Sequence, residues 1–312
     1  MSLVGKKMAT SVGDIVSLIG QADNYASRMN ISIAEAENAY NLKYRVSSSP
    51  GTASSILGIR IPPETPVHTP STGPAIVDHF VDQVRVVNPV VSVGPRLRGS
   101  KGTERREKLE RFGSHVLSRI DINEDEPLWR YLVFQLSLFG ASVVRVLFDE
   151  TLWPTESDNQ KESWPFLVRA IHPSNVYVPS GSRWPYSWVI EKQSRYLHEV
   201  KADYPDWTPA SEYKASGGFV DVYLYWDKDE YVLIGGNTEM ARKPNMLGIP
   251  PYVWGFSGLG YKAKDGDPDS QAAGVLRHVI SELESEVRLR TTADSLWQRT
   301  VYATLVVKIP DE

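Results

Sequence analysis

The feature that most constrains the fold of this chain is a long, charged segment near its C-terminus, predicted to be one helix from about Asp269 to Thr300. At about 1.5 Å per residue, such a helix is on the order of 45 Å long. Its apolar side chains form only a narrow stripe, which consists of Leu276, Val279, Ile280, Leu283 and Val287. A helix of this kind gains little from one small core, so it either packs beside copies of itself or lies across a sheet of its own chain. Periodicity leaves both arrangements open.

Composition places the chain among ordinary globular proteins and excludes several kinds of site. The 312 residues are 41% hydrophobic and 23% charged, which suits two or three domains or one large one. The formal net charge of −4 gives no reason to expect the whole surface to bind nucleic acid. Because cysteine is absent, disulfides, thiol catalysis and cysteine-ligated metals are excluded. The sequence contains no apolar run of about 18 residues and no N-terminal secretory signal, so we expect no membrane partner.

Residues 1–74 are expected to form a helical arm followed by an extended segment. Apolar residues recur at helical spacing over 13–46. Ser32 is predicted to cap the second of two helices there, with Glu35 completing a capping box. Residues 47–74 are rich in Ser, Pro, Thr and Gly, which favours a loop or an extended arm.

Residues 75–262 are expected to form a β-rich unit with packed helices. A helix over 75–88 precedes a basic amphipathic helix that starts near Thr103. Residues 128–139 are apolar almost all round and predict a buried helix that Gly140 ends. Alternating apolar residues then predict strands. These strands cover 141–150, a pair centred on 171–178, a hairpin over 220–236 with its turn at Asp227–Asp229, and 250–255.

One acidic segment has the spacing of a metal-binding loop but does not continue as one. DGDPDS, residues 265–270, opens with Asp-x-Asp-x-Asp, as calcium loops do. Its sixth position is Ser270 rather than glycine, and its twelfth is Leu276 rather than glutamate. We therefore interpret the segment as an acidic loop in which Asp269 or Ser270 caps the next helix.

No other motif predicts catalysis or cofactor binding. The six histidines are scattered, GFSGLG at 255–260 fits no phosphate-binding loop, and no Gly-x-Ser-x-Gly elbow is present. We therefore predict no catalytic residue, no cofactor and no metal. The basic stretch 94–119 suits contact with phosphates, but its interleaved glutamates favour an ordinary solvent-exposed face.

The order of these elements resembles that of portal proteins of tailed bacteriophages. The resemblance covers about residues 75–312, and the order of the pieces carries it rather than any invariant motif. The pieces are LWRYLVFQLSLFGASVVRVLFDE, a strand pair around IHPSNVYV, the hairpin VDVYLYWDKDEYVLIGG, and NMLGIPPYVWG followed by a polar loop, a long charged helix and YATLVVKIP.

This resemblance implies an α+β, portal-like fold. It divides the chain into a helical N-terminal arm over 1–74, a β-rich wing over 75–262, a stem helix over 263–300 and the start of a clip over 301–312. Portal proteins continue with a second stem helix, a tunnel loop and a crown. This sequence stops inside the clip, as a fragment or a shorter relative would.

The function that the resemblance implies is structural rather than enzymatic. Portal subunits form a ring of about twelve copies at one capsid vertex, through which double-stranded DNA is packaged and ejected. The implied partners are the DNA, terminase, the major capsid protein and the head–tail adaptor, and ATP hydrolysis belongs to the terminase. The implied location is the virion, with the host cytoplasm during assembly.

On the stem helix we expect one set of residues to pack between subunits and another to face the DNA. A tunnel wall should avoid tight binding, because every neutralised phosphate adds affinity that translocation must break. The packing set is Leu276, Val279, Leu283 and Val287, the tunnel-facing set is Glu284, Arg288 and Arg290, and the clip residues expected to dock partners are Leu305, Val307 and Lys308.

Two other classes of function stay open. One is a metal-dependent nuclease or hydrolase that uses DGDPD and a histidine. The other is a β-rich ligand-binding module with a stacking surface of tryptophans, for which we prefer a role in the core and in subunit contacts. These tryptophans are Trp184, Trp188, Trp207 and Trp226.

Overall fold

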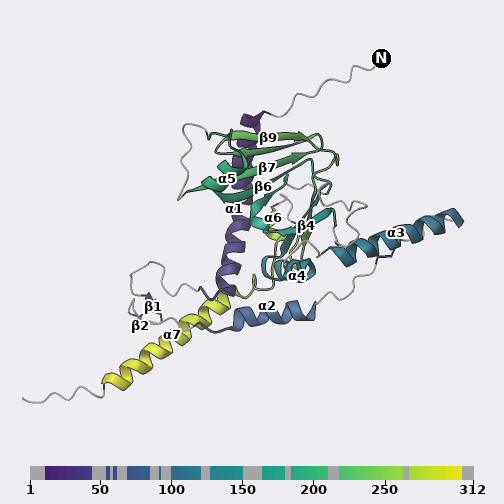
Figure 1. Cartoon of the computed structure of the whole chain (residues 1–312). Coiled ribbons are helices and arrows are strands. Elements are labelled where there is room, and N and C mark those ends of the chain that lie inside the picture. Colours follow the sequence, from purple (N-terminus) through teal and green to yellow (C-terminus); the bar gives the residue numbers. More distant parts are fainter. Residues whose placement is uncertain are drawn as a thin grey trace, which may run out of the picture.

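The computed structural model of the chain has a body of sheets and packed helices, with one helix projecting at each end (Figure 1). The chain mixes helices with antiparallel strands, which confirms the α+β class. The structure describes residues 11–43, 54–56, 59–61, 69–84, 91–92, 100–120, 127–149, 164–179, 184–209, 218–262 and 267–303.

Seven α-helices and one 3₁₀ turn are present in these described residues. They are α1 (Val12–Tyr40), α2 (Thr72–Gln83), α3 (Ser100–Arg119), α4 (Leu128–Phe139), the 3₁₀ turn η2 (Pro173–Asn175), α5 (Leu197–Asp203), α6 (Pro268–Gln271) and α7 (Ile280–Ala303). The predicted basic helix and the predicted buried helix correspond to α3 and α4.

The strands form antiparallel sheets. A small hairpin pairs β1 (Ser54–Ile56) with β2 (Ile59–Ile61). A three-stranded sheet has the order β10 (Tyr252–Phe256), β3 (Ala141–Phe148), β4 (Phe166–Ile171). A five-stranded sheet has the order β5 (Val176–Tyr177), β6 (Trp188–Tyr196), β7 (Phe219–Asp227), β8 (Glu230–Gly235), β9 (Thr238–Pro244). The predicted hairpin is β7 and β8, paired from Trp226↔Tyr231 to Val222↔Gly235.

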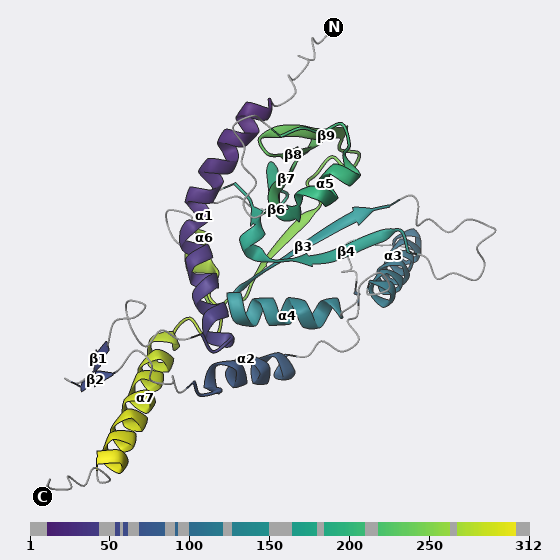
Figure 2. The same ribbon diagram turned by 60° about the vertical axis from the view of Figure 1, so that its left-hand side comes forward.

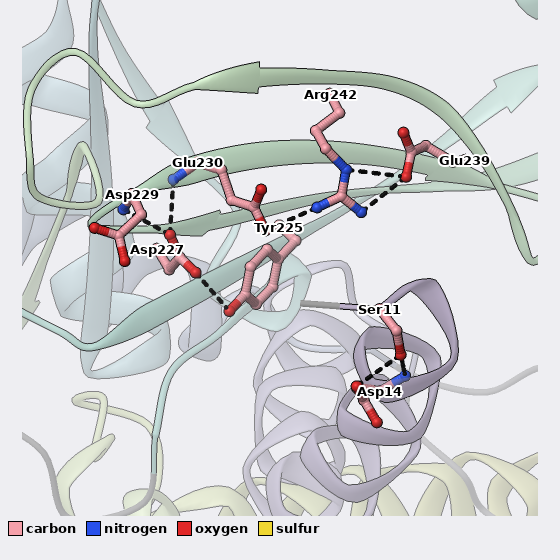
Figure 3. Close-up of polar contacts among 8 residues, drawn as sticks. All are labelled: Ser11, Asp14, Tyr225, Asp227, Asp229, Glu230, Glu239 and Arg242. Atoms are coloured by element: carbon pink, nitrogen blue, oxygen red, sulfur yellow. Dashed lines mark hydrogen bonds and ion pairs between the residues drawn. The ribbon is translucent and has the colours of Figure 1, made fainter. Parts of the chain in front are cut away.

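The N-terminal helix α1 is continuous, which corrects the prediction of two helices with a cap at Ser32. Ser11 caps it instead, because its hydroxyl oxygen accepts a hydrogen bond from the backbone N–H of Asp14 at 3.1 Å (Figure 3). One side of the helix is buried from Ile15 to Ala39 and belongs to the central hydrophobic cluster. α1 therefore runs along the body and covers one side of it (Figure 2).

The helix α4 ends at Gly140, whose φ of 73° is left-handed. A Cβ atom there would lie 2.2 Å from the backbone of Ala273, so both the conformation and the space require glycine. Ala273 belongs to residues 272–279, which we call the crossing segment because they pass over the C-terminus of α4. Within it, the N–H of Val275 donates to the carbonyl of Ser137 at 2.7 Å.

The crossing segment separates α6 from α7, so the prediction of one continuous helix from about Asp269 to Thr300 is wrong. The acidic loop does cap a helix, but the N-cap is Asp267, whose carboxylate accepts from the N–H of Asp269 at 3.0 Å. The crossing segment binds back to this loop, since the Arg277 guanidinium donates to the Asp269 carboxylate at 2.7 Å.

The Asp269 carboxylate gives a pH-dependent contribution to stability. Burial raises the pKa of this carboxylate. Hydrogen bonds from Arg277 and Ser32 together lower the pKa by more than burial raises it, so the net pKa lies below its ordinary value. A lowered pKa stabilises the folded state above the unfolded pKa, and this stabilisation disappears as the pH falls through the folded pKa. We expect Asp269→Asn to lower the thermal midpoint at pH 7 and to have little effect near pH 3. An equal loss at both values would contradict this origin, and Asp206→Asn on the surface is the control.

A buried polar cluster joins the two larger sheets. The Arg145 guanidinium on β3 donates to both carboxylate oxygens of Glu191 on β6, at 2.8 and 3.0 Å. The Tyr252 hydroxyl on β10 donates to the same carboxylate at 2.6 Å, and Gln193 also bonds to it. Burial first, and then the Glu191 charge, raises the pKa of Tyr252 well above its ordinary value, so its hydroxyl remains a donor.

The turn between β7 and β8 is fixed by side chains (Figure 3). The Asp227 carboxylate accepts from the N–H groups of Asp229 and Glu230 at 2.7 and 2.8 Å. The Arg242 guanidinium on β9 donates to Glu230 and Glu239, each at 2.8 Å, and thereby ties β9 to β8. These contacts fix the turn of the hairpin and hold the edge strand β9 against β8.

Candidate functional site

The helix α7 is the best candidate for a functional surface, because it projects from the body and can contact a partner there. It leaves the body at the end opposite α3 (Figures 1 and 2). One ridge of the helix is buried and changes from apolar to small and polar along its length: Leu283, Val287, Thr291 and Ser295. The hydroxyl of Ser295 donates to the carbonyl of Thr291 at 2.8 Å, within the helix itself. The strand β2 lies against α7.

Most of the residues predicted to pack between subunits lie inside the subunit instead. Leu276 and Val279 belong to the crossing segment rather than to the helix, and Leu276 is fully buried in the central cluster of its own chain. Leu283 is part of the same cluster, and Val287 is buried as well. A single chain already covers Leu276, Leu283 and Val287, so we withdraw their assignment to subunit contacts. Val279 is only partly buried, and its contact with a neighbouring subunit stays a prediction.

The opposite face of α7 carries large apolar side chains that this chain leaves in solvent. Leu289 is 56% exposed, Leu296 is 42% exposed and Trp297 is 72% exposed. We did not predict this face from the sequence, although positions 289, 293 and 296–297 have the spacing of a second apolar stripe. A shallow groove of about 630 Å³ continues the face toward the start of the helix, where Glu282 and Glu286 line it.

The residues predicted to face DNA form pairs along α7. The Arg288 guanidinium lies 3.4 Å from the carboxylate of Glu284, and the Arg290 guanidinium contacts the carboxylate of Glu286, each at i,i+4 spacing. Such pairs stabilise a helix by only a few tenths of a kcal/mol, about 0.3–0.5. They do cancel each other's charge, so this surface offers phosphates no continuous positive stripe. The clip residues Leu305, Val307 and Lys308 lie outside the described residues.

One contact pattern resembles a hydrolase relay. His172 places Nδ1 2.6 Å from the Ser174 hydroxyl and Nε2 3.0 Å from the Glu37 carboxylate. The serine is only two residues away, and Nδ1 also accepts from its backbone N–H, which makes His172 the cap of η2. Neither this histidine nor this serine lines the grooves beside Tyr177, between α2 and α4, or on α7. The contact ties α1 to η2, and we assign it a structural role.

The described residues assemble neither of the two alternative sites, and Asp265 of DGDPD lies outside them. Among the described residues, no group of three His, Asp or Glu side chains could hold a metal ion. Trp207 and Trp226 are buried in two different hydrophobic clusters, and Trp188 packs partly buried against a third. Only Trp184 of the four is largely exposed, so no stacking surface forms.

Comparison with known proteins adds no relative. The chain matches no family model, and no curated protein matches it. Within the part of the chain that the structure describes, no helix is long and apolar enough to cross a membrane. The exposed face of α7 is therefore the main physical evidence on function.

Proposed function

We propose that this chain is a portal-type subunit that forms a ring at one vertex of a bacteriophage capsid. In this proposal α7 is the stem helix, the body is the wing, and double-stranded DNA passes along the axis during packaging and ejection. Partners would be terminase, the major capsid protein and the head–tail adaptor. The chain would sit in the virion after assembly in the host cytoplasm, and it would perform no chemistry itself.

One observation carries the proposal: the outward face of α7 exposes large apolar side chains in a single chain. A Trp and two Leu side chains are left in water on a helix that leaves the body, and exposed apolar side chains gathered on one surface indicate an interaction site. Since their positions repeat along a straight helix, a neighbouring helix would cover all three at once. The i,i+4 charge pairs of α7 also suit a wall that DNA passes without tight binding.

We expect Leu289→Asp/Trp297→Asp to convert the assembled ring into monomers. Burying a leucine and a tryptophan contributes on the order of 3 kcal/mol or more per contact, which corresponds to about 100-fold in each dissociation constant. Light scattering coupled to gel filtration measures the mass, and negative-stain images show whether a ring with a central hole is present.

The control is Met246→Asp/Leu247→Asp, which adds the same two charges at positions 90% and 51% exposed on a turn of the body. This variant should assemble like the wild type. A wild-type chain that is monomeric at micromolar concentration would refute the proposal, and so would a ring that survives the double substitution on α7.

A further inference from the structure

Among the described residues, the packing contacts of α3 with other elements lie on its C-terminal part. Its C-terminal part is held, because Ile120 is buried, Val91 packs so closely on Gly113 that a Cβ there would lie 2.8 Å away, and the His115 ring lies 5.5 Å from Trp164. The preceding turns project from the body (Figure 1). An isolated helix of that length is marginal in water, so the projecting part gains from a partner.

The projecting part of α3 carries the side chains that interfaces favour. Leu109 is 45% exposed and Phe112 is 58% exposed. Arg105, Lys108 and Arg111 are exposed around them. Aromatic and arginine side chains are enriched where protein interfaces are energetically strongest. Residues 100–119 hold six basic and three acidic side chains, which is a net charge of +3. Since the whole chain has a formal net charge of −4, the remaining residues carry −7.

The same chain has an acidic groove on another part of its surface. A cleft of about 690 Å³ lies between α2 and α4, with Tyr40 of α1 at its end. Val81 and Phe134 give it apolar walls, and two carboxylates line it, Asp78 and Asp82, one helical turn apart. Arg130 also lines the groove, so two negative charges face one positive charge there. The Tyr40 hydroxyl donates to Asp78 at 3.0 Å. No described residue of α3 lines this groove, so the helix of the same chain does not fill it.

We propose that the projecting part of α3 docks into the α2–α4 groove of a second copy of this chain. The helix supplies cations and two large apolar side chains, and the groove supplies two carboxylates and apolar walls, which is the helix-in-groove mode of recognition. The two surfaces differ, so the contact runs head to tail and closes a ring when the rotation between copies allows. The inference rests on the proposed ring and names a contact in it that is separate from α7.

A cysteine cross-link tests the contact directly, because the chain contains no cysteine. Lys108→Cys/Asp82→Cys places one thiol on the helix and one in the groove, both at exposed positions. Under mild oxidation we expect a ladder of covalent dimers and larger species on a non-reducing gel. The single variants, Lys108→Cys and Asp82→Cys, should run as monomers on the same gel. A double variant that gives only monomer overturns the proposal, as does cross-linking by Lys108→Cys alone, which would place α3 against α3.

Charge reversal gives a second test that does not depend on oxidation. Arg105→Glu/Arg111→Glu reverses the charge of two side chains on the helix, and Asp78→Arg/Asp82→Arg reverses the charge of two side chains in the groove. Each variant alone should lose assembly by light scattering, and an equimolar mixture should recover it, because each reversed helix then meets a reversed groove. The control is Lys201→Glu/Lys228→Glu, which reverses two exposed lysines elsewhere.

The outcomes separate this contact from the proposed function. A wild-type ring that neither charge variant disturbs overturns the contact and leaves the ring standing. A cross-linked ladder without a ring in negative-stain images supports the contact and removes the portal function. If the helix variant assembles normally but loses binding to a fluorescent DNA duplex, α3 binds nucleic acid instead, and the contact between copies is wrong.

Discussion

Replacing Glu191 by alanine is expected to lower the free energy of unfolding by about 3–5 kcal/mol. Glu191 is 2% exposed and accepts hydrogen bonds from Arg145 and Tyr252. Its removal leaves the Arg145 guanidinium buried without its carboxylate, and the cost of an uncompensated buried charge dominates the effect. Because β3 and β6 belong to different sheets, the loss falls on the joint between the two sheets.

Urea unfolding at pH 7 and fixed protein concentration measures this loss. The informative control removes the whole cluster: Arg145→Met/Glu191→Leu/Tyr252→Phe replaces each polar group by an apolar one of similar size. A buried ion pair offers little net stability over well-packed apolar residues, so this variant should lie within about 2 kcal/mol of the wild type. A loss below about 1 kcal/mol for Glu191→Ala would show that the buried charge is not the source of the effect.

The sequence predicted those elements whose pattern is local. The alternation in VDVYLYW and EYVLIGG, with Asp227 between them, specified a hairpin, and the structure has β7 and β8 there. The apolar run before Gly140 specified a helix and its end, because a left-handed residue after a helix is a local signal. For these elements, neighbouring residues determine the backbone.

The sequence did not predict the places where contacts between distant segments change the local backbone structure. Only Gly274 weakens the helical pattern locally between Asp269 and Ile280, yet the whole crossing segment interrupts it because its backbone bonds to the end of α4. Likewise, the capping box at Ser32 is a valid local signal, but the side chain of Ser32 hydrogen-bonds to Asp269 and the helix continues through Ser32. Tertiary contacts outweighed propensity at both places.

The candidate site was predicted in its location but not in its residues. The long charged helix near the C-terminus was recognised, and α7 is that helix in shortened form. Its narrow stripe was assigned to neighbouring subunits, whereas the body and the helix's own chain cover Leu276 and Leu283. Periodicity identifies an apolar face but not its partner, so only the fold could direct attention to Leu289, Leu296 and Trp297.

The attachment of α7 to the body depends on the crossing segment, and Gly274→Ala is expected to loosen it. A Cβ atom at Gly274 would lie 2.0 Å from the Leu138 carbonyl oxygen, which is rigid helix backbone and cannot move aside as a side chain would. The segment must shift, and the bond from the Val275 N–H to the Ser137 carbonyl is then lost. We expect a loss of about 3 kcal/mol or more in the free energy of unfolding.

The matched control for this prediction is Gly20→Ala, where no atom lies within 4 Å of the added Cβ. Since Gly20 lies inside α1, alanine there should raise the free energy of unfolding by about 0.5–1 kcal/mol. Hydrogen exchange locates the effect: in Gly274→Ala the Val275 amide should exchange faster, whereas the amides of the β7–β8 hairpin should keep their wild-type rates relative to global unfolding. Unchanged protection at Val275 would mean that α7 is anchored by other contacts, because a shifted crossing segment cannot keep that hydrogen bond.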